Sequence, residues 1–176
     1  MKSAMLAMAL IFCFELFCAG QNGASGPAPA APIPVQIGNA KTVFISNEEG
    51  EELDPRIYFL KSFDWDRPYN QFFAAIEAGG RFKPVLVPAD ADLILEVRLR
   101  AVPSLPAAPQ PELRLVIVDP KTRAVLWAFT ETIKREGGPH WEQKIEKNFN
   151  DAMTALVGDL TRLAGAGATV GADSRK

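Results

Sequence analysis

The stretch that decides the fold is residues 112–133, ELRLVIVDPKTRAVLWAFTETI. Its first part, residues 113–118, is nearly continuous apolar sequence and predicts one buried strand. Residues 123–133 carry β-branched and aromatic side chains on alternate positions and predict a second strand. Between them, DPKT at 119–122 places proline where a type I turn favours it. The stretch therefore predicts an antiparallel hairpin.

Further elements are predicted on both sides of this hairpin. Upstream, β-rich or alternating sequence predicts strands at 41–46, 81–87 and 92–102. Apolar residues at three- and four-residue spacing predict amphipathic helices at 68–78 and 139–163. Because the last helix presents Phe149 on its apolar face, we expect Phe149 and Trp127 of the hairpin to meet in one core.

This order, β-α-β-β-β-β-α, predicts an α+β fold. We expect a two-layer sandwich, with a mixed sheet of four to five strands and two helices on one face. The first two strands should be parallel, because a helix joins them through a right-handed crossover. The second to fifth strands should form an antiparallel meander or be near neighbours. The proline-rich segment at 103–112 should be a loop outside the sheet, since proline cannot donate to a ladder.

The first twenty residues, MKSAMLAMALIFCFELFCAG, have the regions of a secretory signal. Their apolar run is too short to span a bilayer. Neither Cys13 nor Cys18 follows the small residue that a lipoprotein signal needs, so lipidation is not expected. We expect cleavage near Gly20, or alternatively after Ala24. The mature protein should then be periplasmic or secreted, without membrane attachment.

The rest of the chain divides by composition. Residues 21–40 are rich in Pro, Ala and Gly and predict a flexible tether. Residues 41–163 predict a single domain, and the small residues of 164–176 predict a disordered tail. With 19 basic and 21 acidic residues, the chain has a net charge of −2, which gives no electrostatic case for binding nucleic acid.

Residues with catalytic or metal-binding chemistry are few. His140 is the only histidine in the chain, and a helix-cap or surface role suits it better than catalysis. Asp90 and Asp92 flank a turn and could hold a cation, but aspartate also serves the local hydrogen bonds of such turns. The acidic run at 48–52 does not have the spacing of a calcium loop and is interpreted as solvated. No catalytic, cofactor-binding or metal-binding residue is predicted.

The loop at 48–67 is the candidate interaction surface. It is longer than most loops, and it carries Tyr58, Phe59, Phe63 and Trp65. Tyrosine and tryptophan are favoured at protein interfaces, so these side chains are candidate contact residues. In the alternative interpretation, they cap the open end of the core.

Several segments carry a resemblance to known proteins. They are YNQFFAAIEAGGRFKPVLVPADADLILEVRLR, the hairpin ELRLVIVDPKTRAVLWAFTETI, and the helical NFNDAMTALVGDL. Their pattern resembles uncharacterised exported bacterial envelope proteins and small lipoprotein domains of unknown function. The order of elements is more loosely similar to the lipopolysaccharide-assembly lipoprotein and to the amino-terminal domain of the Tol-system propeller protein. The resemblance covers residues 41–163 and implies a fold and a compartment, but no catalytic residue.

These observations predict a non-catalytic exported module of the cell envelope. Its partner would be another envelope protein or a cell-wall component. The alternative is a binder or chaperone of an apolar, lipid-like ligand, which would need a cavity among Phe72, Phe73, Trp127 and Phe149. An enzyme is a third hypothesis, and no residue is assigned to it.

Overall fold

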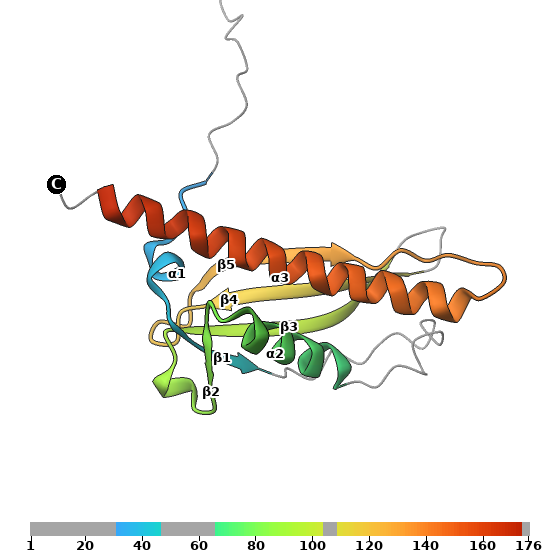
Figure 1. The fold of residues 1–176 in the computed structure, drawn as a ribbon, viewed down its shortest axis with the longest axis horizontal. Coiled ribbons are helices and arrows are strands. Elements are labelled where there is room, and N and C mark those ends of the chain that lie inside the picture. Colours follow the sequence, from blue (N-terminus) through green and yellow to red (C-terminus); the bar gives the residue numbers. More distant parts are fainter. Residues whose placement is uncertain (1–30, 47–65, 104–108, 174–176) are drawn as a thin grey trace, which may run out of the picture. The chain divides into compact units, whose positions relative to one another are not determined.

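The computed structural model describes residues 31–46, 66–103 and 109–173. The chain divides into two compact units, residues 1–32 and 33–176, and every described helix and strand belongs to the second (Figure 1). Its elements are α1 (Val35–Asn39), β1 (Thr42–Ser46), α2 (Arg67–Gly79), β2 (Lys83–Val85), the 3-10 helix η2 (Pro88–Asp90), β3 (Leu93–Val102), β4 (Gln110–Val118), β5 (Val125–Thr132) and α3 (Trp141–Asp173).

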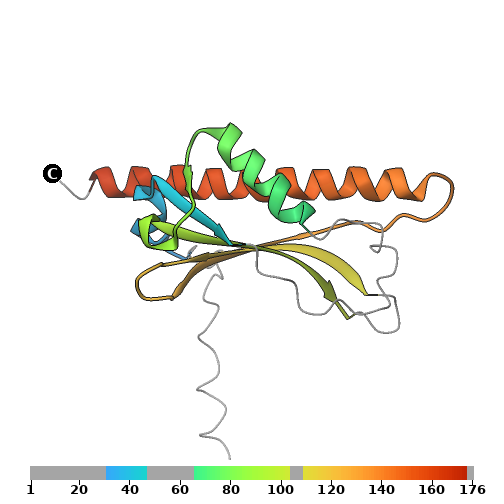
Figure 2. The same ribbon diagram turned by 90° about the horizontal axis from the view of Figure 1, so that it is seen from below.

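The strands form one mixed sheet in the order β2-β1-β3-β4-β5. Strand β1 is parallel to both β2 and β3, whereas β3, β4 and β5 are antiparallel neighbours. Helices α2 and α3 lie on the same side of this sheet (Figure 2). The predicted α+β class and the mixed sheet with helices on one face are therefore confirmed.

The position of β1 corrects one detail of the predicted strand order. Strands β2 and β3 are not neighbours in a meander, because β1 lies between them. Strand β2 has only three residues, and one of them is Pro84, which has no N–H to donate. Such a strand suits an edge, while Val43 and Ile45 of β1 are buried in the interior of the sheet.

The hairpin forms as predicted. Strands β4 and β5 pair in antiparallel register, with Leu115 opposite Phe129. In the turn, one carboxylate oxygen of Asp119 accepts hydrogen bonds from the N–H groups of Lys121 and Thr122, both at 2.8 Å. Strand β4 begins earlier than expected, at Gln110, so part of the proline-rich segment joins the sheet. Pro111 takes part as an acceptor, because its carbonyl receives the N–H of Ile133 at 2.9 Å.

A single core joins the sheet to the helices. It contains the inward-facing residues of the strands and the apolar faces of α2 and α3. Phe72 of α2 and Phe149 of α3 are fully buried in it. Trp127 is partly buried and packs against the same cluster, which confirms that it shares a core with Phe149. A smaller cluster of Ile94, Val116 and Val118 is buried on the other face of the sheet.

Both ends of the domain extend beyond the predicted limits of 41 and 163. Helix α1 lies within the predicted tether, and its Ile37 is fully buried in the core. At the other end, α3 continues to Asp173, and Ala164 is fully buried. The small residues that suggested disorder are compatible with a helix, because alanine has the highest helix propensity. Although α3 has 33 residues, no helix in the described part is both long and apolar enough to cross a membrane.

Candidate functional site

The predicted contact residues Tyr58, Phe59, Phe63 and Trp65 lie outside the described residues, as does the acidic run at 48–52. The predicted signal, residues 1–20, also lies outside them. The candidate site is therefore built from the rest of the chain.

Asp92 has a structural role at the start of β3. One of its carboxylate oxygens accepts the N–H groups of Lys41 and Thr42, at 2.8 and 2.9 Å. These backbone hydrogen bonds, that from Thr42 first, lower the pKa of Asp92. The hydroxyl of Thr42 in turn donates to the carbonyl of Asp90, at 3.1 Å. The pair Asp90 and Asp92 thus fastens β1 to the turn before β3, which agrees with the structural interpretation of these aspartates.

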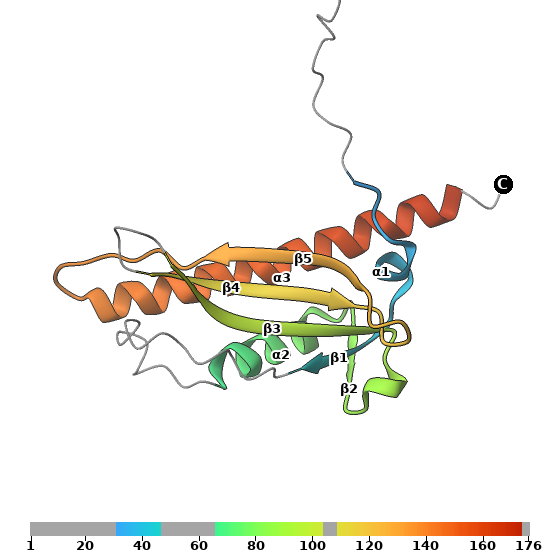
Figure 3. The ribbon, with the colours of Figure 1, turned by 180° about the vertical axis from the view of Figure 1, so that it is seen from behind.

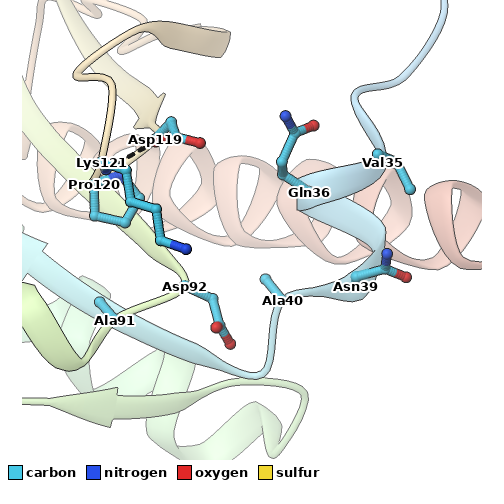
Figure 4. A pocket seen from close by; sticks show the side chains of 9 residues that line it. All are labelled: Val35, Gln36, Asn39, Ala40, Ala91, Asp92, Asp119, Pro120 and Lys121. Carbon is cyan, nitrogen blue, oxygen red and sulfur yellow. Dashed lines mark hydrogen bonds between the residues drawn. The ribbon is translucent and has the colours of Figure 1, made fainter.

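An open depression of about 310 Å³ lies beside this junction (Figure 4). It is lined by Val35, Gln36, Asn39, Ala40, Ala91, Asp92, Asp119, Pro120 and Lys121. The turn hydrogen bonds lower the pKa of Asp119, as those to β1 do for Asp92. Both carboxylates in this depression are therefore used to hold turns together. Across the described residues, no group of three or more His, Cys, Asp or Glu side chains could hold a metal ion.

His140 is exposed immediately before α3. Its φ of 58° lies in the left-handed region, which a non-glycine residue rarely adopts. Its carbonyl accepts the N–H of Lys144 at 3.2 Å, so the residue contributes to the first turn of the helix. This position agrees with the cap or surface role expected from the sequence.

The two edges of the sheet differ sharply. Strand β2 forms one edge and is blunted by its length of three residues, by Lys83 and by Pro84. Among the described strands, β5 forms the other edge with eight residues, VLWAFTET, which include no lysine and no proline. Natural proteins protect exposed edges with short strands, lysine, proline, inward-facing charges and bulges. Strand β5 has the inward-facing Glu131 and a register shift against β4 near Val118, but it is long and lacks lysine and proline.

The backbone of β5 offers hydrogen-bonding groups to a partner. The N–H of Ile133 donates to β4, and in an antiparallel pair every second residue points its backbone groups to the same neighbour. The intervening residues Ala128, Thr130 and Thr132 therefore point theirs away from β4, toward the open edge. All three side chains are exposed. The edge of β5 is the candidate functional site.

Helix α3 borders the end of this edge. A depression of about 390 Å³ lies where the last residues of β5 meet the helix. It is lined by Glu131, Thr132, Lys134, Glu136, Lys147, Asn148, Asp151, Ala152 and Ala155. The amide of Asn148 donates to the carbonyl of Lys134 at 2.9 Å and ties the chain after β5 to α3. The open edge is thus held in place at one end by the helix.

Glu131 in this region gives a testable pH dependence. Burial raises its pKa, and the negative charge of Asp159 on α3 raises it further. A raised pKa favours the protonated form in the folded state, so this contribution to stability is present at acid pH and is lost as the pH rises through the folded pKa. The variant Glu131→Gln should therefore unfold at a higher temperature than the parent protein at pH 7. At a pH below the usual value of 4.5, this advantage should disappear. Thermal unfolding at both pH values tests this, and a less stable variant at pH 7 would contradict it.

The described residues define a small α+β domain whose mixed sheet is covered by helices on one face and ends in a long edge strand without lysine or proline. No protein-family profile matches the chain, and no curated protein matches it. Solved structures of bacterial proteins are similar to it. Protein XCC0632 from Xanthomonas campestris, described as DUF330, is 16% identical with a TM-score of 0.45, over 85% of this chain and 94% of that chain. The PelC dodecamer from Paraburkholderia phytofirmans is 15% identical with a TM-score of 0.39, over 76% of this chain and 91% of that chain. A neuraminyllactose-binding hemagglutinin homolog from Helicobacter pylori is 16% identical with a TM-score of 0.41, over 77% of this chain and 91% of that chain.

Proposed function

We propose that this protein is a non-catalytic, exported module of the bacterial cell envelope that binds a partner protein by adding a partner strand to β5. The observation that carries the proposal is the edge strand of eight residues without lysine or proline, opposite a blunted edge of three residues. In strand addition, main-chain hydrogen bonds supply affinity and alternate side chains supply specificity. The envelope location is supported by the signal-like residues 1–20 and by the resemblance of residues 41–163 to small lipoprotein domains.

The side chains of β5 suit this role. Trp127 and Phe129 face the helices, are partly buried, and have their rings 6.5 Å apart. A partner strand on the open edge would extend the sheet. The inward side chains of that partner strand would therefore pack beside the rings of Trp127 and Phe129. Partly exposed aromatic groups of this kind are typical anchors of protein interfaces.

The alternative of a lipid-like ligand requires a cavity among Phe72, Phe73, Trp127 and Phe149. Phe72 and Phe149 have no exposed surface and belong to one continuous core cluster with the sheet. Closely packed side chains favour the protein-interaction hypothesis over a ligand cavity.

A substitution at Thr130 tests strand addition. Thr130→Pro removes the N–H that points to the open edge, and proline is tolerated at edge positions whose N–H faces solvent. Thr130→Ala is the matched control, because it keeps the N–H. We expect Thr130→Pro to weaken capture of the partner from an envelope extract at least tenfold, and Thr130→Ala to leave it within twofold. Hydrogen exchange of the amides of Ala128, Thr130 and Thr132 should slow in the complex. Equal capture by both variants, with unchanged exchange at these amides, would exclude the edge as the site.

A further inference from the structure

Figure 3 views the sheet from the face opposite helices α2 and α3. The alternation of side chains along β3 and β4 places several arginines on this face. Successive side chains of a strand alternate between the two faces, and the inward positions Val97, Leu99 and Leu113 are buried in the core. The intervening side chains therefore lie on the other face. Those of β3 and β4 include Arg98, Arg100 and Arg114, and Arg123 reaches the same face from the turn before β5. These four arginines are named the basic face.

Two of these arginines lie directly opposite each other. Arg98 on β3 pairs in register with Arg114 on β4. Like charges at directly opposite positions of an antiparallel pair are destabilising. Arg98 is held by Glu96, at 3.3 Å. The cost of the pair therefore leaves the guanidinium of Arg114 to be explained.

Two glutamates lie on this face among the described residues. The carboxylate of Glu96 is buried, accepts a hydrogen bond from Arg98 at 3.3 Å and lies 4.0 Å from Arg123. Arg100 faces Glu112 in register, but no ion pair joins them. The guanidinium groups of Arg100 and Arg114 make no hydrogen bond or ion pair within the part of the chain that the structure describes. On the described part of this face, four arginines thus accompany two glutamates.

The basic face adjoins the open edge. In the sheet, Arg114 lies opposite Thr130 of β5, and Glu112 lies opposite Thr132. Both threonine side chains are short and exposed. Among the described residues on this face, only such short side chains lie between Arg114 and the open edge of β5. A strand added to β5 would lie about 5 Å beyond it, and its outward side chains would continue these same rows. A glutamate in the row of Thr130 is long enough to meet Arg114 above that threonine.

We infer that the partner strand carries an acidic side chain at its outward position beside Thr130, which the basic face binds through Arg114. Arg100 lies two strands away from β5, with Glu112 of β4 between them. This inference rests on the proposed function, since it assumes that the partner occupies the edge of β5. Arginine pairs with carboxylates through two parallel hydrogen bonds, which fixes the position of an acidic side chain as well as attracting it. The basic face would therefore set the register of the added strand. The backbone hydrogen bonds of β5 would supply the part of the affinity that does not depend on the partner's side chains.

Two eight-residue peptides test this inference on the full chain. One alternates valine with glutamate, and the other alternates valine with glutamine, so they differ only in charge. We expect the acidic peptide to bind at least tenfold more tightly at low salt, as measured by fluorescence anisotropy. The variant Arg114→Gln should abolish this preference. The control Arg162→Gln removes one charge from an arginine that is 79% exposed on α3, and it should keep the preference.

The outcomes separate this inference from the proposed function. Equal binding of both peptides, lost in Thr130→Pro, would overturn the acidic preference and leave strand addition intact. Binding of the acidic peptide that survives in Thr130→Pro would overturn both, as would failure of both peptides to bind. Vesicles of phosphatidylglycerol are the last probe, and binding to them that depends on Arg114 would assign the basic face to a lipid surface instead. Because the guanidinium of Arg114 has no described partner, Arg114→Gln should not lower stability, and thermal unfolding checks this.

Discussion

Replacing Phe149 with alanine is expected to lower the free energy of unfolding by about 3–5 kcal/mol, the range for removing a fully buried phenylalanine. Phe149 has no exposed surface, and it lies in the layer between α3 and the sheet. The guanidinium of Arg67 lies 4.5 Å from the centre of its ring, so the substitution also removes a cation–π contact between α2 and α3. The loss combines transfer of the ring to water with the cavity that it leaves.

Denaturant unfolding of two variants measures this effect. Trp141→Ala is the control, because Trp141 lies on the same helix with 38% of its surface exposed. Its replacement should cost less than about 1 kcal/mol, as expected for surface substitutions. If Phe149→Ala costs no more than this control, the packing of α3 on the sheet is wrong.

Replacing Asp92 with alanine is expected to cost about 1–2 kcal/mol, because the side chain is exposed and solvent weakens its hydrogen bonds. Its carboxylate accepts two backbone N–H groups, and hydrogen bonds to a charged group are among the stronger ones in proteins. Without Asp92, the start of β1 loses its attachment to the turn before β3. Asp90→Ala is the matched control, since Asp90 uses its backbone carbonyl in this junction and should lose little stability.

The same interaction gives a pH dependence. Backbone hydrogen bonds from Thr42 and Lys41 lower the pKa of Asp92 below its usual value of 3.8. A lowered pKa contributes stability that is present above the unfolded pKa and is lost as the pH falls through the folded pKa. The difference in stability between the parent protein and Asp92→Asn should therefore be full at pH 7 and shrink as the pH falls below 3.8. A difference that stays constant down to pH 2 would contradict the role of the charge.

The sequence predicted those parts of the fold that local pattern controls. Alternation in 123–133 identified β5, and three- and four-residue spacing identified α2 and α3, because these periods follow from backbone geometry. Strand order has no such local signal, so the position of β1 between β2 and β3 was missed. Helix α1 was missed because Ile37, its buried anchor, lies within a Pro- and Ala-rich segment that resembles a linker.

For the candidate site too, local sequence pattern predicted some features and could not predict those that depend on strand order. Tyr58 and its aromatic neighbours were chosen by residue type, and they lie outside the described residues. The edge of β5 was not chosen, because edge and interior strands look alike until the strand order is known. One signal of the strand order was available in the sequence, because Pro84 marks its own strand as an edge. The hairpin strand at 125–132 contains no proline and so carries no such mark. The opposition of Arg98 and Arg114 depends on the register of β3 and β4 and could not be read from one strand alone.

The central position of β1 has a consequence during synthesis. Thr42 at the start of β1 bonds to Asp92, which lies 50 residues later in the chain. At usual rates of elongation, about 3–10 seconds separate the appearance of these two residues. During that interval, Val43 and Ile45 have no neighbouring strand from β3 to cover them. The first strand of the sheet to be synthesised therefore stays without its two neighbours until β2 and β3 have followed it.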